Sequence, residues 1–130
     1  MTSVQVMRRT AVSLLMAATV ACGKAASPTV PSGPPVATTT VTISASGVSP
    51  KDIQVALGER VLFINNDTRA HEMTSNPHPE HTDCPPINQV GFLQPGQRRE
   101  TGNFVQTTVC GYHDHSNPDT QGLKGTITIK

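Results

Sequence analysis

The fold is decided by residues 53–67, which read IQVALGERVLFINND. Apolar and polar residues alternate from Ile53 to Leu57, as a half-buried β-strand requires. A Gly-Glu pair interrupts this pattern, and the run from Val61 to Ile64 is apolar on both faces, which is typical of a central strand. The Asn-Asn-Asp that ends the stretch favours a turn. Two strands joined by a short connection therefore indicate an all-β domain.

Three further segments carry strand signals. They are residues 41–45, 104–113 and 126–129, each rich in β-branched or alternating apolar residues. No window shows a helical period, and the eleven prolines and ten glycines of this 130-residue chain argue against a helical bundle. Short strands separated by such turns predict an all-β, Greek-key β-sandwich over residues 41–130.

The first 21 residues have the pattern of an export signal. Arg8 and Arg9 precede an apolar run from Ala11 to Ala21. A basic start, about ten apolar residues and a small-residue boundary predict a secretory signal peptide over residues 1–21, whether translation starts at the first or the second methionine. The run is shorter than the roughly 18–20 apolar residues of a membrane-spanning helix. We therefore expect an exported protein.

The segment around Cys22 resembles a bacterial lipobox. Val20-Ala21-Cys22-Gly23 has the small residues and the cysteine of that motif, although Thr19 stands where a bulky apolar residue is usual. The resemblance implies that Cys22 is acylated and anchors the protein to a membrane, in the bacterial periplasm or at the cell surface. Cleavage by an ordinary signal peptidase without acylation is the alternative. Residues 22–40 are mostly Ala, Ser, Pro, Thr and Gly and predict a flexible linker.

Charge and motifs argue against several function classes. The formal net charge of +1 gives no electrostatic reason to expect a nucleic-acid partner. The sequence has no glycine-rich phosphate loop after a strand and no Gly-x-Ser-x-Gly motif, and it therefore gives little reason to expect an enzyme. The unusual feature is five histidines beside three cysteines, because both residue types bind metals.

Cys84 and Cys110 are the two cysteines within the expected sandwich. In an oxidising compartment an even pair forms a disulfide by default. The bond would pin the proline-rich segment 74–96, which lacks a strand pattern, to the strand expected at 104–113. In the chain-entropy account, closing the loop between Cys84 and Cys110 stabilises the folded state by about 3–4 kcal/mol.

The order of the segments resembles the cupredoxin family. The matching residues are Val48-Ser49-Pro50-Lys51-Asp52-Ile53, the run from Gly58 to Asn66 followed by His71, and Leu123-Lys124-Gly125-Thr126-Ile127-Thr128-Ile129 as the last strand. The resemblance covers residues 41–130. It implies a β-sandwich with a metal site at one end, built from the loops that join the strands.

The resemblance allows two ligand sets. In the first, Cys110 and His113 form the Cys-x-x-His of a blue-copper site together with His71, and Leu123 takes the axial position. A cysteine cannot be both a thiolate ligand and half of a disulfide. This first set and the pairing of Cys84 with Cys110 therefore exclude each other.

In the second set, the segment Tyr112-His113-Asp114-His115 resembles the Tyr-His-x-His of multicopper oxidase domains. Asp114 then stands in the place of the thiolate, and the implied ligands are His71, His113 and His115. Strand parity favours this set, because it turns Tyr112 and Cys110 toward the core. Two further candidates are Met73, as a weak thioether contact, and His81, although His78 and His81 also suit a solvated loop.

The sequence thus predicts an exported copper-binding protein for electron transfer or copper handling, with a redox partner protein as one expected contact. Imidazole nitrogens suit copper, and zinc fits the same donors. Two alternatives stay open: a metal-free, disulfide-stapled binding module with the same fold, and a copper oxidase-type enzyme assembled from several copies. The oligomeric state is left open by the sequence.

Overall fold

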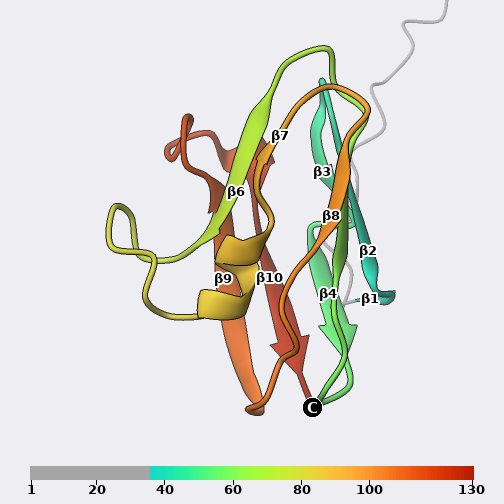
Figure 1. The fold of residues 1–130 in the computed structure, drawn as a ribbon, viewed down its shortest axis with the longest axis vertical. Coiled ribbons are helices and arrows are strands. Elements are labelled where there is room, and N and C mark those ends of the chain that lie inside the picture. The colour runs from blue at the N-terminus through green and yellow to red at the C-terminus, as the bar shows by residue number, and fades with distance from the viewer. Residues whose placement is uncertain (1–35) are drawn as a thin grey trace, which may run out of the picture. The chain divides into compact units, whose positions relative to one another are not determined.

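The computed structural model describes residues 36–130, which form two β-sheets and two short 3₁₀-helices (Figure 1). The predictions for the signal peptide, for Cys22 and for most of the linker lie outside the described residues. Among residues 36–130, no helix is long and apolar enough to cross a membrane.

The strands are divided between a six-stranded and a four-stranded sheet. The larger sheet has the order β1 (Val36–Ala37), β4 (Asp52–Val55), β10 (Lys124–Ile129), β9 (Thr108–Asp114), β6 (His71–Ser75) and β7 (Gly91–Leu93). The smaller has the order β3 (Gly47–Ser49), β2 (Thr40–Ser44), β5 (Leu62–Asn65) and β8 (Arg98–Glu100). The 3₁₀-helices are η1 (Pro85–Gln89) and η2 (Gln121–Leu123). In Figure 1 the two sheets lie face to face, which confirms the predicted all-β sandwich.

The core fills the space between the sheets, as the alternation in the sequence requires. Every second residue of β2, β4, β5 and β10 is buried, while the residues between them are partly exposed. Phe63 of β5 and Tyr112 of β9 meet edge to face across the sandwich, with ring centroids 5.3 Å apart. Such a pair adds about 0.5–1.5 kcal/mol beyond the area that it buries.

Tyr112 also depends on a glycine in the neighbouring strand. Its hydroxyl donates to the carbonyl of Lys51 over 3.0 Å. Gly125 of β10 pairs with Tyr112 of β9. A Cβ at position 125 would overlap with the tyrosine ring and with the same Lys51 carbonyl. The glycine of the last strand is therefore required by the aromatic residue beside it.

Several strands differ from their predicted extent. The strand that begins in the alternating stretch ends at Val55, because Leu57 lies in a turn whose amide donates to the Lys130 carbonyl. The strand expected from Phe104 begins at Thr108, since the Phe104 amide bonds to Glu59 outside the sheets. Strands β1, β3, β6, β7 and β8 were not predicted, because they are short and three of them carry mostly small or polar residues. Of these, β1 lies within the predicted linker 22–40, where Val36 and Ala37 pair with β4.

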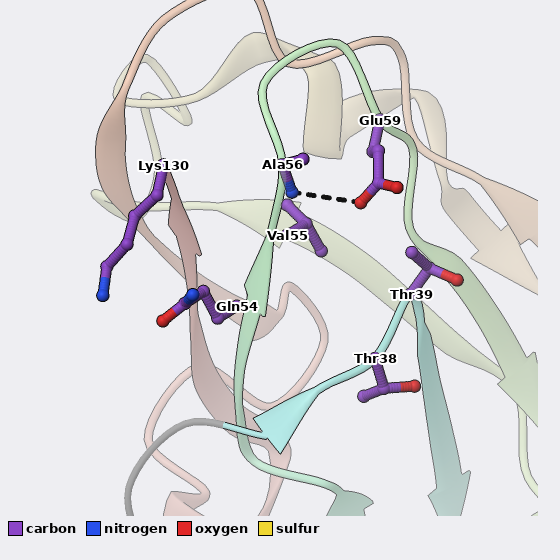
Figure 2. A pocket seen from close by; sticks show the side chains of 7 residues that line it. All are labelled: Thr38, Thr39, Gln54, Val55, Ala56, Glu59 and Lys130. Atoms are coloured by element: carbon purple, nitrogen blue, oxygen red, sulfur yellow. Dashed lines mark hydrogen bonds between the residues drawn. The ribbon is translucent and has the colours of Figure 1, made fainter.

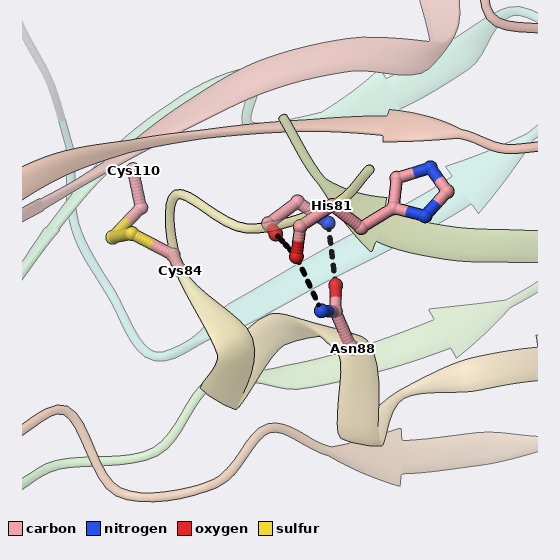
Figure 3. The surroundings of a disulfide bond; sticks show 5 residues. His81, Cys84, Asn88 and Cys110 are labelled. Atoms are coloured by element: carbon pink, nitrogen blue, oxygen red, sulfur yellow. Dashed lines mark hydrogen bonds between the residues drawn. A yellow bond between two sulfur atoms is a disulfide. The ribbon is translucent and has the colours of Figure 1, made fainter. Parts of the chain in front are cut away.

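A long loop leaves the larger sheet between β6 and β7 and is tied back to it by a disulfide (Figure 3). The bond joins Cys84, just before η1, to Cys110 in β9, with the two Cα atoms 5.8 Å apart. The predicted pairing is present, and Cys110 therefore offers no thiolate to a metal in this structure.

Candidate metal centre

Four histidine rings gather beside the end of β9. His78 and His81 come from the loop after β6, and His113 and His115 come from the last residues of β9 and the turn that follows. One ring nitrogen from each of His78, His81 and His113 lies within 4.8 Å of the others. The Nδ1 of His115 lies 3.2 Å from the Nε2 of His81. The four rings form a group that we call the histidine cluster.

The histidine cluster lies on the outer face of the larger sheet. Successive side chains of a strand point to opposite faces, and Tyr112 points inward to contact Phe63. His113 therefore points outward, where the loop after β6 covers it so completely that its relative exposure is 2%. His81 and His115 are partly exposed and His78 is exposed.

The loop is held against β9 by several contacts besides the disulfide. The carbonyl of His81 accepts hydrogen bonds from the Ser75 hydroxyl at 2.9 Å and from the Asn88 amide at 2.8 Å (Figure 3). Asn88 in turn accepts from the backbone amide of Ser75 at 2.9 Å. These bonds hold His81 at a φ of 55°, in the left-handed region that residues other than glycine rarely adopt.

The surroundings of His81 and His113 favour the uncharged form of these two imidazoles. Burial lowers the pKa of His113, and the neighbouring imidazoles and Lys124 lower it further. Burial likewise lowers the pKa of His81, together with His115 and His78, although the carboxylates of Glu72 and Glu80 act in the opposite direction. An uncharged imidazole keeps a nitrogen lone pair, which is the form that binds a metal.

His71 does not join the cluster. Its Nδ1 lies 2.9 Å from Oδ2 of Asp114 and its Nε2 lies 3.0 Å from Oδ2 of Asp67, with all three side chains almost fully buried. Both ring nitrogens of His71 therefore face carboxylate oxygens, which accept hydrogen bonds, and neither lies in the histidine cluster. His71, which the resemblance implied as a ligand, thus lies between two buried carboxylates, and we call these three residues the buried network.

The two carboxylates of this network are held ionised. The hydrogen bond from His71 is the main cause that lowers the pKa of Asp67 to about 2, against the opposing effect of burial. Burial acts to raise the pKa of Asp114, but hydrogen bonds from His71, from the Asn117 amide and from two backbone amides outweigh it and lower the pKa overall. Two ionised carboxylates therefore lie against the His71 ring.

The other candidates from the sequence have different surroundings. Met73 is fully buried in the hydrophobic core, and Leu123 of η2 is also a core residue.

His113 and His115 do come together, and His81 joins them as the further candidate. The sequence predicts His78 only as part of a solvated loop, whereas the structure brings its ring into the cluster. The available signal was the loop itself, since the expected disulfide would pin it beside the strand that carries His113.

Two hollows open on the surface of the sandwich. One lies beside the cluster and is lined by His78 and His113 together with Asn76, Pro77, Asp83, Pro118, Asp119 and Lys124. The other lies near the opposite end of β10, around Lys130 and Glu59, where the Glu59 carboxylate accepts from the amide of Ala56 at 3.0 Å (Figure 2). No histidine or cysteine lines this second hollow among the described residues, so the chemistry concentrates in the first.

The fold places the chain among structures of one class. A purple cupredoxin from Nitrosopumilus maritimus is similar, with a TM-score of 0.55, 20% identity, and coverage of 72% of this chain and 100% of that chain. Plastocyanin from Dryopteris crassirhizoma has a TM-score of 0.54 and 15% identity over 70% of this chain and 99% of its own. A Cu(I) form of an amicyanin variant has a TM-score of 0.52 and 16% identity over 70% of this chain and 80% of its own.

These similarities show that the chain has the cupredoxin fold, as the order of its segments indicated. No family model matches the sequence, and no curated protein matches it. At 15–20% identity the likeness concerns the fold alone. What this domain binds must therefore be inferred from its own side chains.

Proposed function

We propose that this protein binds copper through His78, His81, His113 and His115 and serves in copper handling at the cell envelope. The observation that carries the proposal is the histidine cluster, in which four imidazoles lie together without a thiolate. Imidazole donors suit copper, and among the divalent first-row metals Cu(II) binds such donors most tightly. Zinc fits the same donors and is tested by competition.

Handling is favoured over blue-copper electron transfer by the state of Cys110. A blue-copper site needs a cysteine thiolate with two histidines, and Cys110 is in a disulfide. The hollow beside His78 and His113 leaves one side of the cluster open to solvent. An ion held there by imidazoles could be passed to or taken from a partner protein.

The location is part of the same proposal. Signal-like residues 1–21 and the cysteine at position 22 support export and lipid anchoring in a bacterial envelope, and a disulfide is characteristic of an oxidising compartment. We expect Cys22→Ala to move the protein from the membrane fraction to the soluble envelope fraction. Unchanged membrane association of the variant would contradict the anchor.

Copper titration with spectroscopy tests the binding. We expect the purified mature protein to contain no free thiol in the sandwich and to bind one equivalent of Cu(II). The copper-loaded protein should absorb visible light only weakly and should give a type 2 electron paramagnetic resonance signal. His81→Gln and His113→Gln should each weaken binding at least about tenfold, because losing even an outer partner of a ligand costs that much. Thr82→Ala changes an exposed residue beside His81 and serves as the control.

Each of the other possible results would favour a different ligand set or function for this protein. An intense blue band would show a thiolate ligand and contradict the proposed set. No binding would leave the metal-free module as the function. A copper-dependent oligomer seen by light scattering would favour the oxidase-type assembly instead.

A further inference from the structure

Asn76 lies where the loop leaves β6 and contacts β9 in two ways. Its backbone amide donates to the carbonyl of Gly111 over 3.1 Å, and its side-chain Oδ1 lies 2.9 Å from Nδ1 of His113. Its own carbonyl accepts from the amide of Asp83 at 2.9 Å, on the far side of the histidine loop. The first residue of the loop is therefore fixed to both the strand and the loop.

The contact with His113 determines where the ring carries its proton. An amide oxygen only accepts hydrogen bonds, so Nδ1 of His113 must donate. A neutral imidazole has a single ring proton, and with that proton on Nδ1 the lone pair is on Nε2. The neighbour of Nε2 is the Thr74 hydroxyl at 3.4 Å, which is a long contact to a group that can rotate.

Gly111 makes this arrangement possible. It lies two residues before His113 in β9 and therefore on the same outer face. A Cβ at position 111 would overlap with the side-chain amide of Asn76. A glycine inside a strand weakens the strand and often marks a close approach of another group. In this strand the approaching group is the amide that faces His113.

The other rings of the cluster have no comparable fixed partner. Among the described residues, the ring nitrogens of His81 and His115 have a hydrogen-bond contact only with each other, and the ring of His78 has none. His113 is also the most buried of the four. It is therefore the one ring of the cluster whose orientation is set before any metal arrives.

We infer that Asn76 is a positioning residue for the metal centre: its amide oxygen holds His113 as the Nδ1–H tautomer, which leaves the lone pair of Nε2 for the ion. Partners of this kind fix the ring of a metal-binding histidine and raise its basicity. The inference rests on the proposed metal site, but the tautomer itself exists without metal. The two can therefore be tested separately.

The tautomer is measured first, on the metal-free mature protein. Long-range ¹H–¹⁵N correlation spectra at neutral pH should show His113 protonated at Nδ1. Asn76→Leu, which keeps the size but removes the acceptor, should give a mixture of tautomers, and Asn76→Asp should restore the Nδ1–H form. Gly111→Ala should disturb the tautomer like Asn76→Leu, because it displaces the amide without changing its chemistry. A His113 ring protonated at Nε2 in the unaltered protein would overturn the inference.

Cu(II) affinity is measured next on the same proteins. We expect Asn76→Leu to weaken binding by about 10–100-fold and Asn76→Asp to recover most of it. Thr82→Ala controls for a change in the loop that removes no ring partner. An Asn76→Leu protein with altered tautomer and unaltered affinity would overturn the positioning role. Absence of copper binding in the unaltered protein, with the tautomer as expected, would instead contradict the proposed function.

Discussion

The Nδ1 of His71 lies 2.9 Å from Oδ2 of Asp114, and both side chains are almost fully buried. By the resemblance to cupredoxins, His71 is the first metal ligand and Asp114 stands in the place of the thiolate. With a carboxylate in that place, the two residues bond to each other. Carboxylates therefore surround His71 inside the sandwich, while the histidine cluster lies on the outer face of the larger sheet.

Asp114→Asn should destabilise the domain strongly. The change replaces one of the two carboxylates that face His71 by an amide, and leaving a buried group without its hydrogen-bond partner costs about 1–3 kcal/mol. Urea unfolding at neutral pH measures the loss. Asp119→Asn is the matched control, because Asp119 is exposed and in the turn region after the same strand. Equal midpoints for both variants would show that the pair contributes little.

Acid should unfold the protein in a window set by Asp67. Its pKa is about 2 in the folded state, below the ordinary value of 3.8, so the folded state favours the ionised form. A lowered carboxyl pKa gives stability that is complete above the ordinary value and is lost as the pH falls toward the folded value. The free energy of unfolding should therefore fall between about pH 4 and pH 2.

The control for the acid experiment is Asp67→Asn, which removes the titrating group. Its free energy of unfolding should be lower at neutral pH, and the decrease between about pH 4 and pH 2 should be smaller than in the unaltered protein. An identical pH profile for the two proteins would assign the acid sensitivity to other carboxylates.

Removing the disulfide should weaken both the fold and the metal site. The double variant Cys84→Ser, Cys110→Ser loses the tie that closes the loop, at a cost of about 3–4 kcal/mol in the chain-entropy account. Copper affinity should fall as well, because the loop that carries His78 and His81 is no longer fixed to β9. Denaturant unfolding and copper titration measure the two effects. Unaltered affinity would show that the remaining loop contacts suffice.

Gly125→Ala should be costly although it adds only a methyl group. The new Cβ would overlap with the Tyr112 ring and the Lys51 carbonyl, and overpacking of this kind costs about 1–3 kcal/mol. Gly122→Ala is the control, because a Cβ there would make only ordinary contacts, at 3.5 Å and beyond. The difference between the two midpoints in thermal or denaturant unfolding checks the prediction.

Local patterns in the sequence were enough for the fold. Alternating apolar residues located the strand around Ile53, and a continuous apolar run located the strand around Phe63. The pairing of Cys84 with Cys110 followed from an even number of cysteines in the sandwich of a protein predicted to be exported. Strand β6 was not predicted, because its inward positions include His71 and Ser75, whose burial depends on hydrogen-bond partners elsewhere in the chain.

The candidate site was less accessible to sequence reasoning. His113 and His115 are two residues apart, and this spacing related them in the sequence. No sequence motif shows that Asp67 and Asp114 contact the two ring nitrogens of His71. His78 was left out for a similar reason. Its position depends on a loop closed by a disulfide and by the contact of Asn76 with Gly111, and these are contacts between segments far apart in sequence.

The bond between Cys84 and Cys110 has a consequence for the order in which the protein matures. With the proposed ligands, one half of the metal centre lies on the loop and the other half on the strand, and this bond joins the two. Thiol oxidation should therefore precede metal loading. A chain that is still reduced has two free sulfurs and a histidine loop held by fewer contacts, so we expect the proposed imidazole site to be fully ordered only after the bond has formed.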